Sequence, residues 1–582
     1  MKFENKVVLI TGSGTGIGMT VAKKFVESGA SVIILGRRKE PLESTSEMLT
    51  KIINEKNSNG FVKIFSGVDV SDENAITEMF DALKNEGVNV DIVVNNAGVS
   101  GPVTCFAHAP LEDFRSTVDI HLTGTFWTSV QALKVMKEGA KIITISTFFA
   151  EERPLEQRPY RFRGPYTASQ GAKNRLVEAM SWELTEKGIV SIGTNPGPVH
   201  SDRIYKTVYP KAASEFLRVS GFEELIPTEV EIVNKEILGL LGEDEETIKN
   251  GIKAAAEKLG KQESTLTNLL NKVQSIAEKI QKNTSTMIPD QQFLSQDQVA
   301  TTILTLADDD QAKILNGKII PGDRVFYPVR SHITSIPETV KQHDYSSKIA
   351  VLTIDATDEE DAKRAEEIAA NIESNGGQAI CFISDKCSKE VQDSITNKFH
   401  SHVIDFSKNE EITRWFNTAK SKGDIEVFIH ITGKVPNISR LTELSRKEWD
   451  GLTNKFINIP ATVSQNAMNI FVPNGSDDPR LFKDATGRIV IIGPDLPYGK
   501  KIGGGERAKV EVFRGALRPF ATTVNQELSD VLKSNVRVFL VLAGAVDGKE
   551  PNNARITDAI NYSISNDSKS SAEVIFCPDE SR

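Results

Sequence analysis

Residues 6–38 constrain the fold of this chain more than any other stretch. They read KVVLITGSGTGIGMTVAKKFVESGASVIILGRR. Residues 7–10 form a short apolar, β-branched run, which is typical of a strand buried on both faces of a parallel sheet. An amphipathic helix is expected from about residue 19 to residue 27, and residues 32–35 form a second apolar run. The stretch therefore predicts a β-α-β unit whose first turn is rich in glycine.

That first turn is predicted to bind the pyrophosphate of a dinucleotide. A tight turn and a close approach of backbone to phosphate both require glycine, and the start of the helix offers free N–H groups. A Gly-rich turn without a ligand is the alternative, which the strand–helix–strand setting disfavours. The residues assigned to this turn are Gly12, Ser13, Gly16, Ile17 and Gly18.

The end of the second predicted strand indicates which dinucleotide binds. NAD sites usually place Asp or Glu there for the ribose 2′-hydroxyl, whereas Arg accommodates a 2′-phosphate. The strand here ends in Gly36-Arg37-Arg38. We therefore expect NADPH.

The composition argues against several classes of function. The 582 residues suffice for two or three domains, and a net charge of −10 without a basic block argues against a nucleic-acid partner. No apolar run is long enough to span a membrane, and residues 1–4 do not begin a signal peptide, so we expect a cytoplasmic protein. The four cysteines and eight histidines show no disulfide or metal-ligand spacing.

Four further apolar runs, at 62–70, 91–94, 141–145 and 189–193, predict parallel strands. Ligands of open α/β sheets bind beyond the carboxyl ends of such strands. The residues at or after those ends are Asp69, Val70, Asn96, Gly98, Ser146, Thr147, Pro196, Gly197 and Val199. Tyr166 lies at the expected start of a helix.

Together these motifs resemble the short-chain dehydrogenase/reductase family. The matching segments are TGxxxGIG, NNAG, the hydroxyl residues at 146–147, the downstream Tyr166 and the PGPV at 196–199. They cover residues 6 to about 205, and the region near 316–318 resembles the family's last strand. The resemblance implies a Rossmann-type α/β domain. It also assigns cofactor contacts to Asp69, Val70, Asn96, Gly98, Pro196, Gly197 and Val199, in addition to Arg37, Arg38 and the Gly-rich turn.

The resemblance also implies the catalytic residues. In the family a Tyr donates a proton to the substrate oxygen, a Ser or Thr polarises the carbonyl, and a Lys four residues after the Tyr holds the nicotinamide ribose. Tyr166 and Thr147 match the first two positions, but Gln170 stands in place of the lysine. Lys173, one turn further along the helix, is the candidate to replace it. His121 stands where the family carries the Asn of its water relay.

Three of these residues have plain structural alternatives. A lysine such as Lys173 is more often a solvated residue of a helix surface. His121 could be a buried packing residue with satisfied hydrogen bonds, and Thr147 could cap a turn. The sequence leaves these alternatives open.

The chain is expected to divide into four parts. Residues 1–205, completed by 298–330, form the NADP-binding catalytic domain. Residues 206–297 are rich in Leu, Ile, Glu and Lys at helical spacing and form a helical insertion, which is either a solvated bundle or a substrate lid. Residues 331–345 are a linker, and residues 346–582 repeat the strand pattern as an internal duplication.

The second copy is predicted to be degenerate. The run at 349–354 matches the first strand, and DIEVFIHITG at 424–433 echoes DIVVNNAG at 91–98. The Gly-rich loop, however, has become DATDEE at 355–360, whose carboxylates would repel a pyrophosphate. No Tyr occupies the catalytic position, where Gly503-Gly504-Gly505 is expected. This copy is therefore expected to bind no cofactor.

The tandem plan resembles one half of the bacterial bifunctional malonyl-CoA reductases, and more closely their C-terminal half. The long segment between Thr147 and Tyr166, the large insertion, and GRIVIIGPDLP with the helix after it carry that resemblance. It implies NADPH-dependent reduction of malonyl-CoA to malonate semialdehyde, toward 3-hydroxypropionate in carbon fixation. The alternatives are reduction of malonate semialdehyde or another oxo acid, and a non-catalytic nucleotide-binding protein.

A malonyl substrate carries a carboxylate, which a guanidinium binds in bidentate fashion. Arg203, in an Asp-Arg pair that both halves of the malonyl-CoA reductases carry, is the first candidate. Arg163 and Arg161 are further candidates, for which a surface role is equally open. The expected partners are an acyl-CoA or small oxo acid and a second copy of the chain in a homodimer.

Overall fold

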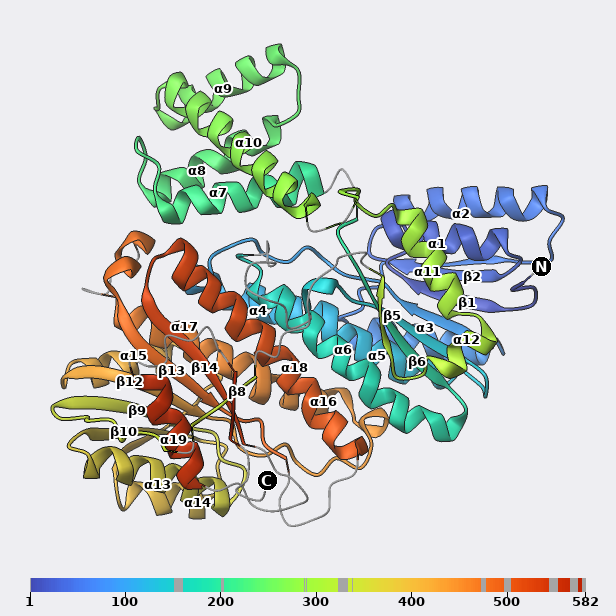
Figure 1. The fold of residues 1–582 in the computed structure, drawn as a ribbon. Coiled ribbons are helices and arrows are strands. Elements are labelled where there is room, and N and C mark those ends of the chain that lie inside the picture. Colours follow the sequence, from blue (N-terminus) through green and yellow to red (C-terminus); the bar gives the residue numbers. More distant parts are fainter. Residues whose placement is uncertain are drawn as a thin grey trace.

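The computed structural model describes residues 2–150, 161–199, 204–286, 288, 290–322, 333–337, 339–472, 478–496, 504–543, 553–565 and 574–577. Two parallel sheets, each flanked by helices, make up most of the chain, and a group of helices stands apart from both (Figure 1). The predicted tandem α/β plan with a helical insertion is thereby confirmed.

The first sheet has the strand order β3-β2-β1-β4-β5-β6-β7, with every neighbouring pair parallel. Its strands are β1 (Val7–Thr11), β2 (Ser31–Gly36), β3 (Val62–Ser66), β4 (Ile92–Asn95), β5 (Lys141–Ile145), β6 (Val190–Pro196) and β7 (Ile319–Gly322). The order reverses between β1 and β4, where ligands of such sheets bind. The strand expected at 62–70 is shorter than predicted, because Gly67, with φ of +79°, follows its last residue.

Helices pack on this sheet through small and apolar faces. In α1 (Gly16–Glu27), the buried residues include Val21, Ala22, Phe25 and Val26, which recur at helical spacing. The other helices of this domain are α2 (Lys39–Glu55), α3 (Glu73–Asn85), α4 (Leu111–Val118), α5 (Gly124–Ala132), α6 (Gly164–Leu184), α11 (Gln296–Leu306) and α12 (Asp309–Ile314). A π-helical turn, η2 (Asp119–Thr123), joins α4 to α5.

The insertion folds around a core of its own. Its helices are α7 (Tyr209–Ser220), α8 (Pro227–Ile237), α9 (Glu245–Leu259) and α10 (Glu263–Ser285). They bury a separate cluster that includes Leu217, Val233, Ile252, Leu266 and Leu269. In Figure 1 this bundle projects away from the two sheets.

The second sheet repeats the order of the first, with one added strand. It runs β11-β10-β9-β12-β13-β14-β15-β8. Its strands are β8 (Ile333–Ser335), β9 (Lys348–Ile354), β10 (Gln378–Ser384), β11 (His400–Ile404), β12 (Asp424–Ile431), β13 (Thr486–Ile492), β14 (Asn535–Ala543) and β15 (Val574–Cys577). The added strand β8 lies within residues 331–345, which the sequence analysis treated as a linker, and it pairs in parallel with β15.

The helices of the second copy follow the same plan. They are α13 (Glu359–Ser374), α14 (Lys389–Thr396), α15 (Asn409–Lys420), α16 (Arg446–Thr453), α17 (Ile459–Phe471), α18 (Gly504–Gln526) and α19 (Asn553–Ile564). A π-helical turn, η9 (Asn454–Asn458), lies between α16 and α17, as η2 does between α4 and α5.

The two copies meet through equivalent helices, α6 and α18, which lie side by side in the middle of the molecule (Figure 1). The crossing is at Gly171 and Gly515. A Cβ on Gly515 would lie 2.9 Å from the carbonyl oxygen of Gly171, and a Cβ on Gly171 would overlap the carbonyl oxygen of Gly515. Beside the crossing, Trp449 of α16 stacks on Phe126 of α5 with a centroid distance of 3.7 Å.

The contact between Gly171 and Gly515 also determines which residues of α6 and α18 are equivalent. Glu183 follows Gly171 at the same spacing as Glu527 follows Gly515, and each carboxylate accepts backbone N–H groups from the other copy. In this register Val510 occupies the place of Tyr166. The sequence analysis had expected Gly503-Gly504-Gly505 there. This expectation was wrong, because Gly504 and Gly505 only begin α18.

We predict that Gly171→Ala destabilises the protein at this crossing, because the new methyl group meets backbone that cannot move aside. Overpacking of this kind typically costs about 1–3 kcal/mol. Gly505→Ala, in the same helix pair but with no atom within 4 Å of its Cβ, is the matched control. Urea unfolding of both variants measures the difference, and equal free energies of unfolding would contradict the prediction.

Candidate active site

The turn after β1 has the geometry of a phosphate cradle. Gly12 and Gly16 have φ of +65° and +64°, in the left-handed region that favours glycine. A Cβ on Gly18 would lie 2.5 Å from Nδ2 of Asn96. The residue before α1, Thr15, makes no side-chain hydrogen bond to the helix, so the first N–H groups of α1 keep their capacity to bind a phosphate.

Two of the predicted cofactor residues hold this turn in place. The hydroxyl of Ser13 donates to the carbonyl oxygen of Ile10 at 2.9 Å and accepts from the N–H of Leu35 at 3.0 Å. Nδ2 of Asn96 donates to the carbonyl oxygens of Thr11, at 2.9 Å, and Gly12, at 3.1 Å. Both side chains therefore fix the backbone that would face the pyrophosphate.

The residues expected to select NADPH lie at the rim of the same turn. Arg37 is exposed, and its guanidinium lies 3.5 Å from the carboxylate of Asp69. Arg38 is exposed and directly precedes α2. Gly98 is exposed, whereas Val70 is buried against Gly124, on which a Cβ would lie 2.8 Å from Val70 Cγ2.

The structure brings Tyr166, His121 and Gln170 together. Tyr166 lies in the first turn of α6, and its ring meets the ring of His121 edge-on at 5.3 Å. Nε2 of Gln170 donates to Nδ1 of His121 at 2.9 Å, and Nε2 of His121 donates to the carbonyl oxygen of Val99 at 2.9 Å. His121 is buried and hydrogen-bonded, and its Nε2 also lies 3.3 Å from the backbone nitrogen of Val99.

One atom of this group has no partner among the described residues. Oε1 of Gln170 is buried and accepts no hydrogen bond there. A buried acceptor without a donor is costly unless a ligand satisfies it. At the position where the family lysine binds the nicotinamide ribose, this oxygen fits a ribose hydroxyl.

Thr147 and Ser146 follow β5 beside the same helix, and both are buried. The hydroxyl of Ser146 donates to the carbonyl oxygen of Gln170 at 3.1 Å.

Lys173 is not a solvated surface residue. It is 1% exposed, and Nζ donates to the carbonyl oxygen of Ile145, at the end of β5, at 2.7 Å. Burial without a nearby carboxylate lowers the pKa of Lys173 to about 7. Since Lys173 lies about 10 Å along the helix axis from Tyr166, it supports the segment that carries Ser146 and Thr147.

Of the three arginines predicted to bind the substrate carboxylate, the structure describes Arg163 and Arg161. Arg163 is 4% exposed and stacks over the ring of Tyr166 at 4.3 Å, so a surface role for it is wrong. Arg161 pairs with Asp530 of the second copy at 2.7 Å. Arg203 lies outside the described residues.

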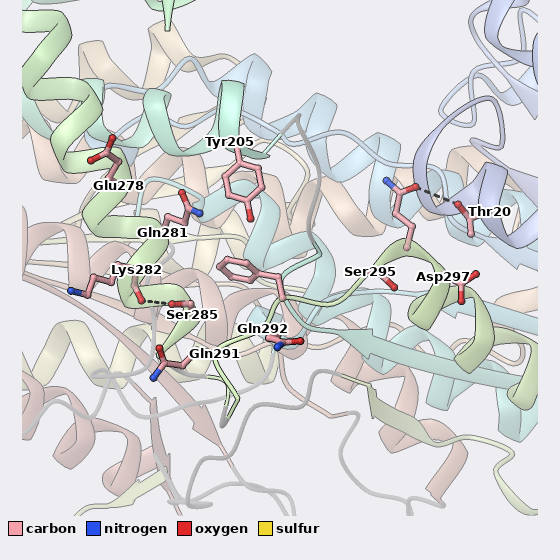
Figure 2. Close-up of a pocket in the computed structure, with 12 residues that line it drawn as sticks. Thr20, Tyr205, Glu278, Gln281, Lys282, Ser285, Gln291, Gln292, Ser295 and Asp297 are labelled. Atoms are coloured by element: carbon pink, nitrogen blue, oxygen red, sulfur yellow. Dashed lines mark hydrogen bonds between the residues drawn. The ribbon is translucent and has the colours of Figure 1, made fainter. Parts of the chain in front are cut away.

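The end of β6 leads from this site to the insertion. Pro196 is the last residue of the strand, Gly197 is buried, and Val199 forms an isolated parallel bridge with Leu294. Beyond that bridge lies a groove of about 1120 Å³. Figure 2 shows Tyr205 and Gln281 on one side of it and Thr20 of α1, hydrogen-bonded to Gln296, on the other.

The corresponding turn of the second copy is closed by its own side chains. The carboxylate of Asp358 accepts from the N–H groups of Glu360 and Asp361, both at 3.1 Å, and so caps α13. Lys434 pairs with Asp358 at 2.8 Å and also with Glu360. The N-terminus of α13, which corresponds to the uncapped N-terminus of α1, is thus occupied by a carboxylate of the chain itself.

Within the described ranges, no group of three His, Cys, Asp or Glu residues is placed to hold a metal ion. No described helix combines the length and apolar character that a membrane crossing needs.

Comparison with known proteins finds relatives of the first copy. A family model described as short chain dehydrogenase matches residues 6–209. A 3alpha-hydroxysteroid dehydrogenase of Mediterraneibacter gnavus is 32% identical over 206 residues, which are 35% of this chain and 78% of that protein. A 7alpha-hydroxysteroid dehydrogenase of Escherichia coli is 26% identical over 227 residues, covering 39% and 83%.

Two solved structures share the fold of nearly the whole chain. The C-domain of a bacterial malonyl-CoA reductase, solved with NADP, has a TM-score of 0.75 at 16% identity and covers 99% of both chains. The N-domain, also with NADP, has a TM-score of 0.71 at 15% identity and covers 99% of this chain and 98% of that one. The tandem arrangement with an insertion is therefore a known architecture.

We predict that buried Lys173 makes stability depend on pH. Between a folded pKa of about 7 and an ordinary value near 10.4, the folded protein binds fewer protons than the unfolded chain. The free energy of unfolding should therefore rise with pH across this window, relative to Lys173→Met, with a slope approaching about 1.4 kcal/mol per pH unit. Urea unfolding at several pH values measures it.

Lys187→Met, at an exposed position after α6, is the control and should run parallel to the wild type. A constant difference between the wild type and Lys173→Met across this pH range would contradict the prediction.

Proposed function

The chain belongs to the short-chain dehydrogenase/reductase family of oxidoreductases, and we propose that it uses NADPH to reduce malonyl-CoA to malonate semialdehyde and free CoA. The observation that carries the proposal is that the first copy combines an uncapped α1 terminus at the switch point of its sheet with a helix, α6, on which Tyr166 lies beside His121. The second copy has the same fold with that terminus capped and Val510 in the place of Tyr166. The likeness in architecture to malonyl-CoA reductase domains supports the choice of substrate class.

Residues of this chain fit three parts of NADPH. The N–H groups at the start of α1 suit the pyrophosphate, the exposed Arg37 suits the 2′-phosphate, and Oε1 of Gln170 suits a ribose hydroxyl. When bound, NADPH supplies the hydride. This assignment accounts for the orphaned oxygen of Gln170 without requiring the family lysine.

The phenol of Tyr166 is placed to give the proton that the reduced carbonyl oxygen needs. The hydroxyl of Thr147 is the candidate donor that polarises the same carbonyl. Addition of one hydride to the carbonyl carbon and one proton to its oxygen gives a thiohemiacetal. When this collapses, the C–S bond breaks and the hydroxyl proton passes to the departing sulfur, so the products are the aldehyde and CoA thiol. The hydrogen bonds of His121 to Gln170 and Val99 hold the imidazole perpendicular to the Tyr166 ring.

We predict one NADPH site per chain, with Arg37 selecting the cofactor. Arg37→Ala should weaken NADPH binding tenfold or more, since a charge-assisted contact is worth about 1.5–3 kcal/mol, and should leave NADH binding nearly unchanged. Lys39→Ala, exposed two residues further on, is the control. Calorimetric titration that returns two sites per chain, or equal affinity of the wild type for NADH and NADPH, would overturn this.

We predict that the wild type oxidises NADPH with malonyl-CoA and not with acetyl-CoA. Tyr166→Phe should lower kcat by about 100-fold or more, the usual contribution of a general acid, while Tyr562→Phe should not. NADPH consumption is followed by absorbance with malonyl-CoA, malonate semialdehyde and acetyl-CoA side by side. Turnover of malonate semialdehyde alone would favour the aldehyde reductase, and full activity in Tyr166→Phe would exclude this mechanism.

A further inference from the structure

Glu527, a residue of the second copy, reaches into the first copy next to the catalytic helix. It begins η12 (Glu527–Val531), directly after α18, and is 1% exposed. Its two oxygens accept from the N–H of Phe106 at 2.7 Å and the N–H of Phe162 at 2.8 Å. A carboxylate buried between two domains is costly unless such bonds compensate for its lost hydration.

Phe162 has an unusual backbone conformation. Its φ is +66°, the left-handed region that a bulky side chain rarely adopts. Its N–H is held by Glu527, and its carbonyl oxygen accepts from the N–H of Thr104 at 3.1 Å. A strained residue persists where its surroundings fix it on both sides, and such residues cluster at functional sites.

The strained residue lies two residues before the first residue of α6. Arg163 follows it, and the guanidinium of Arg163 stacks over the ring of Tyr166 at 4.3 Å. The carbonyl oxygen of Arg163 accepts from the N–H of Thr167 at 2.9 Å, in the first turn of the helix. The backbone conformation of Phe162 therefore determines the direction in which the chain enters Arg163 and the first turn of α6.

Other contacts seat the same end of α6 on the second copy. The hydroxyls of Thr167 and Thr523 are 3.1 Å apart, and a Cβ on Gly164 would lie 4.0 Å from the ring of Phe520. The first turn of α6 thus lies on α18. Glu527 differs from these contacts because it binds the strained residue itself.

We infer that Glu527 is a positioning residue for Tyr166, acting through Phe162 and Arg163, so that the second copy completes the active site of the first. This inference rests on the proposed role of Tyr166 as the proton donor. It gives the second copy a part in the reaction, although its own nucleotide turn is closed.

The chain contains a matched control at the other end of the same helix pair. Glu183, near the end of α6, is buried and accepts from the N–H groups of Leu441, at 2.6 Å, and Thr442, at 3.0 Å, in the second copy. It makes the same kind of bond across the same interface. The loop that it binds belongs to the copy in which Val510 replaces Tyr166.

The test compares Glu527→Gln with Glu183→Gln in the full chain. An amide keeps one acceptor oxygen and turns an N–H group toward the second donor, so each variant loses one interdomain hydrogen bond. We expect kcat with malonyl-CoA to fall about tenfold or more in Glu527→Gln, with KM for NADPH unchanged. Glu183→Gln should stay within about twofold. Adding Arg163→Gln to Glu527→Gln should cause no further loss, because both act on one path.

A readout without turnover separates this inference from the proposed reaction. Tyrosines labelled with 3-fluorotyrosine report their environments by ¹⁹F NMR, and Tyr166→Phe identifies the Tyr166 signal. That signal should shift in Glu527→Gln and in Arg163→Gln, and stay in place in Glu183→Gln. If Glu527→Gln does not fold, Glu527→Asp, whose shorter side chain cannot span both donors, should give the same shift.

An unmoved Tyr166 signal, equal losses of kcat in the two Gln variants, or additive losses with Arg163→Gln would overturn the inference and leave Glu527 as an interface residue only. A moved signal in a protein that does not turn over malonyl-CoA would uphold the positioning role and refute the proposed substrate.

Discussion

The close crossing of α6 and α18 at Gly171 and Gly515 is the contact on which the rest of the arrangement depends. Neither glycine tolerates a Cβ without overlap or close contact with the opposite backbone, so the two helices touch along their backbones. This proximity brings Trp449 onto Phe126 and Glu527 under the start of α6. The helix that carries Tyr166 is buried along most of its length because a second copy of the fold lies on it.

The two copies differ most sharply in one electrostatic detail. Both have a strand, a turn and a helix at the switch point of a parallel sheet, and both helix termini carry the same dipole. In α1 no side chain caps the terminus, whereas in α13 Asp358 occupies it and Lys434 neutralises the added charge. A phosphate at the start of α13 would have to displace the carboxylate of Asp358, which is part of the chain and cannot diffuse away. One capping residue thus separates a binding turn from a closed one.

The sequence allowed the fold and the outline of the site to be predicted, because strands buried on both faces and a Gly-rich turn leave strong local patterns. The burial of Lys173 could not be predicted, since the residue type favours exposure and the covering elements come from distant parts of the chain. The stacking of Arg163 on Tyr166 and the role of Glu527 depend on contacts between copies, which no local spacing encodes. Which residue of α18 is equivalent to Tyr166 of α6 could not be predicted for the same reason, because the Gly171–Gly515 contact between the copies determines it.

Strand β8 has a consequence for the order in which the chain can fold. It follows the first copy in sequence, yet its strand neighbour among the described residues is β15, which is placed after every other strand of the second copy. On a ribosome β8 therefore emerges long before the edge it pairs with exists. The first copy can form its sheet as it is synthesised, while the second sheet closes only after β15 has left the exit tunnel. The helix that covers α6, α18, also lies late in the chain, so a nascent chain holds a complete nucleotide turn before it holds a finished active site.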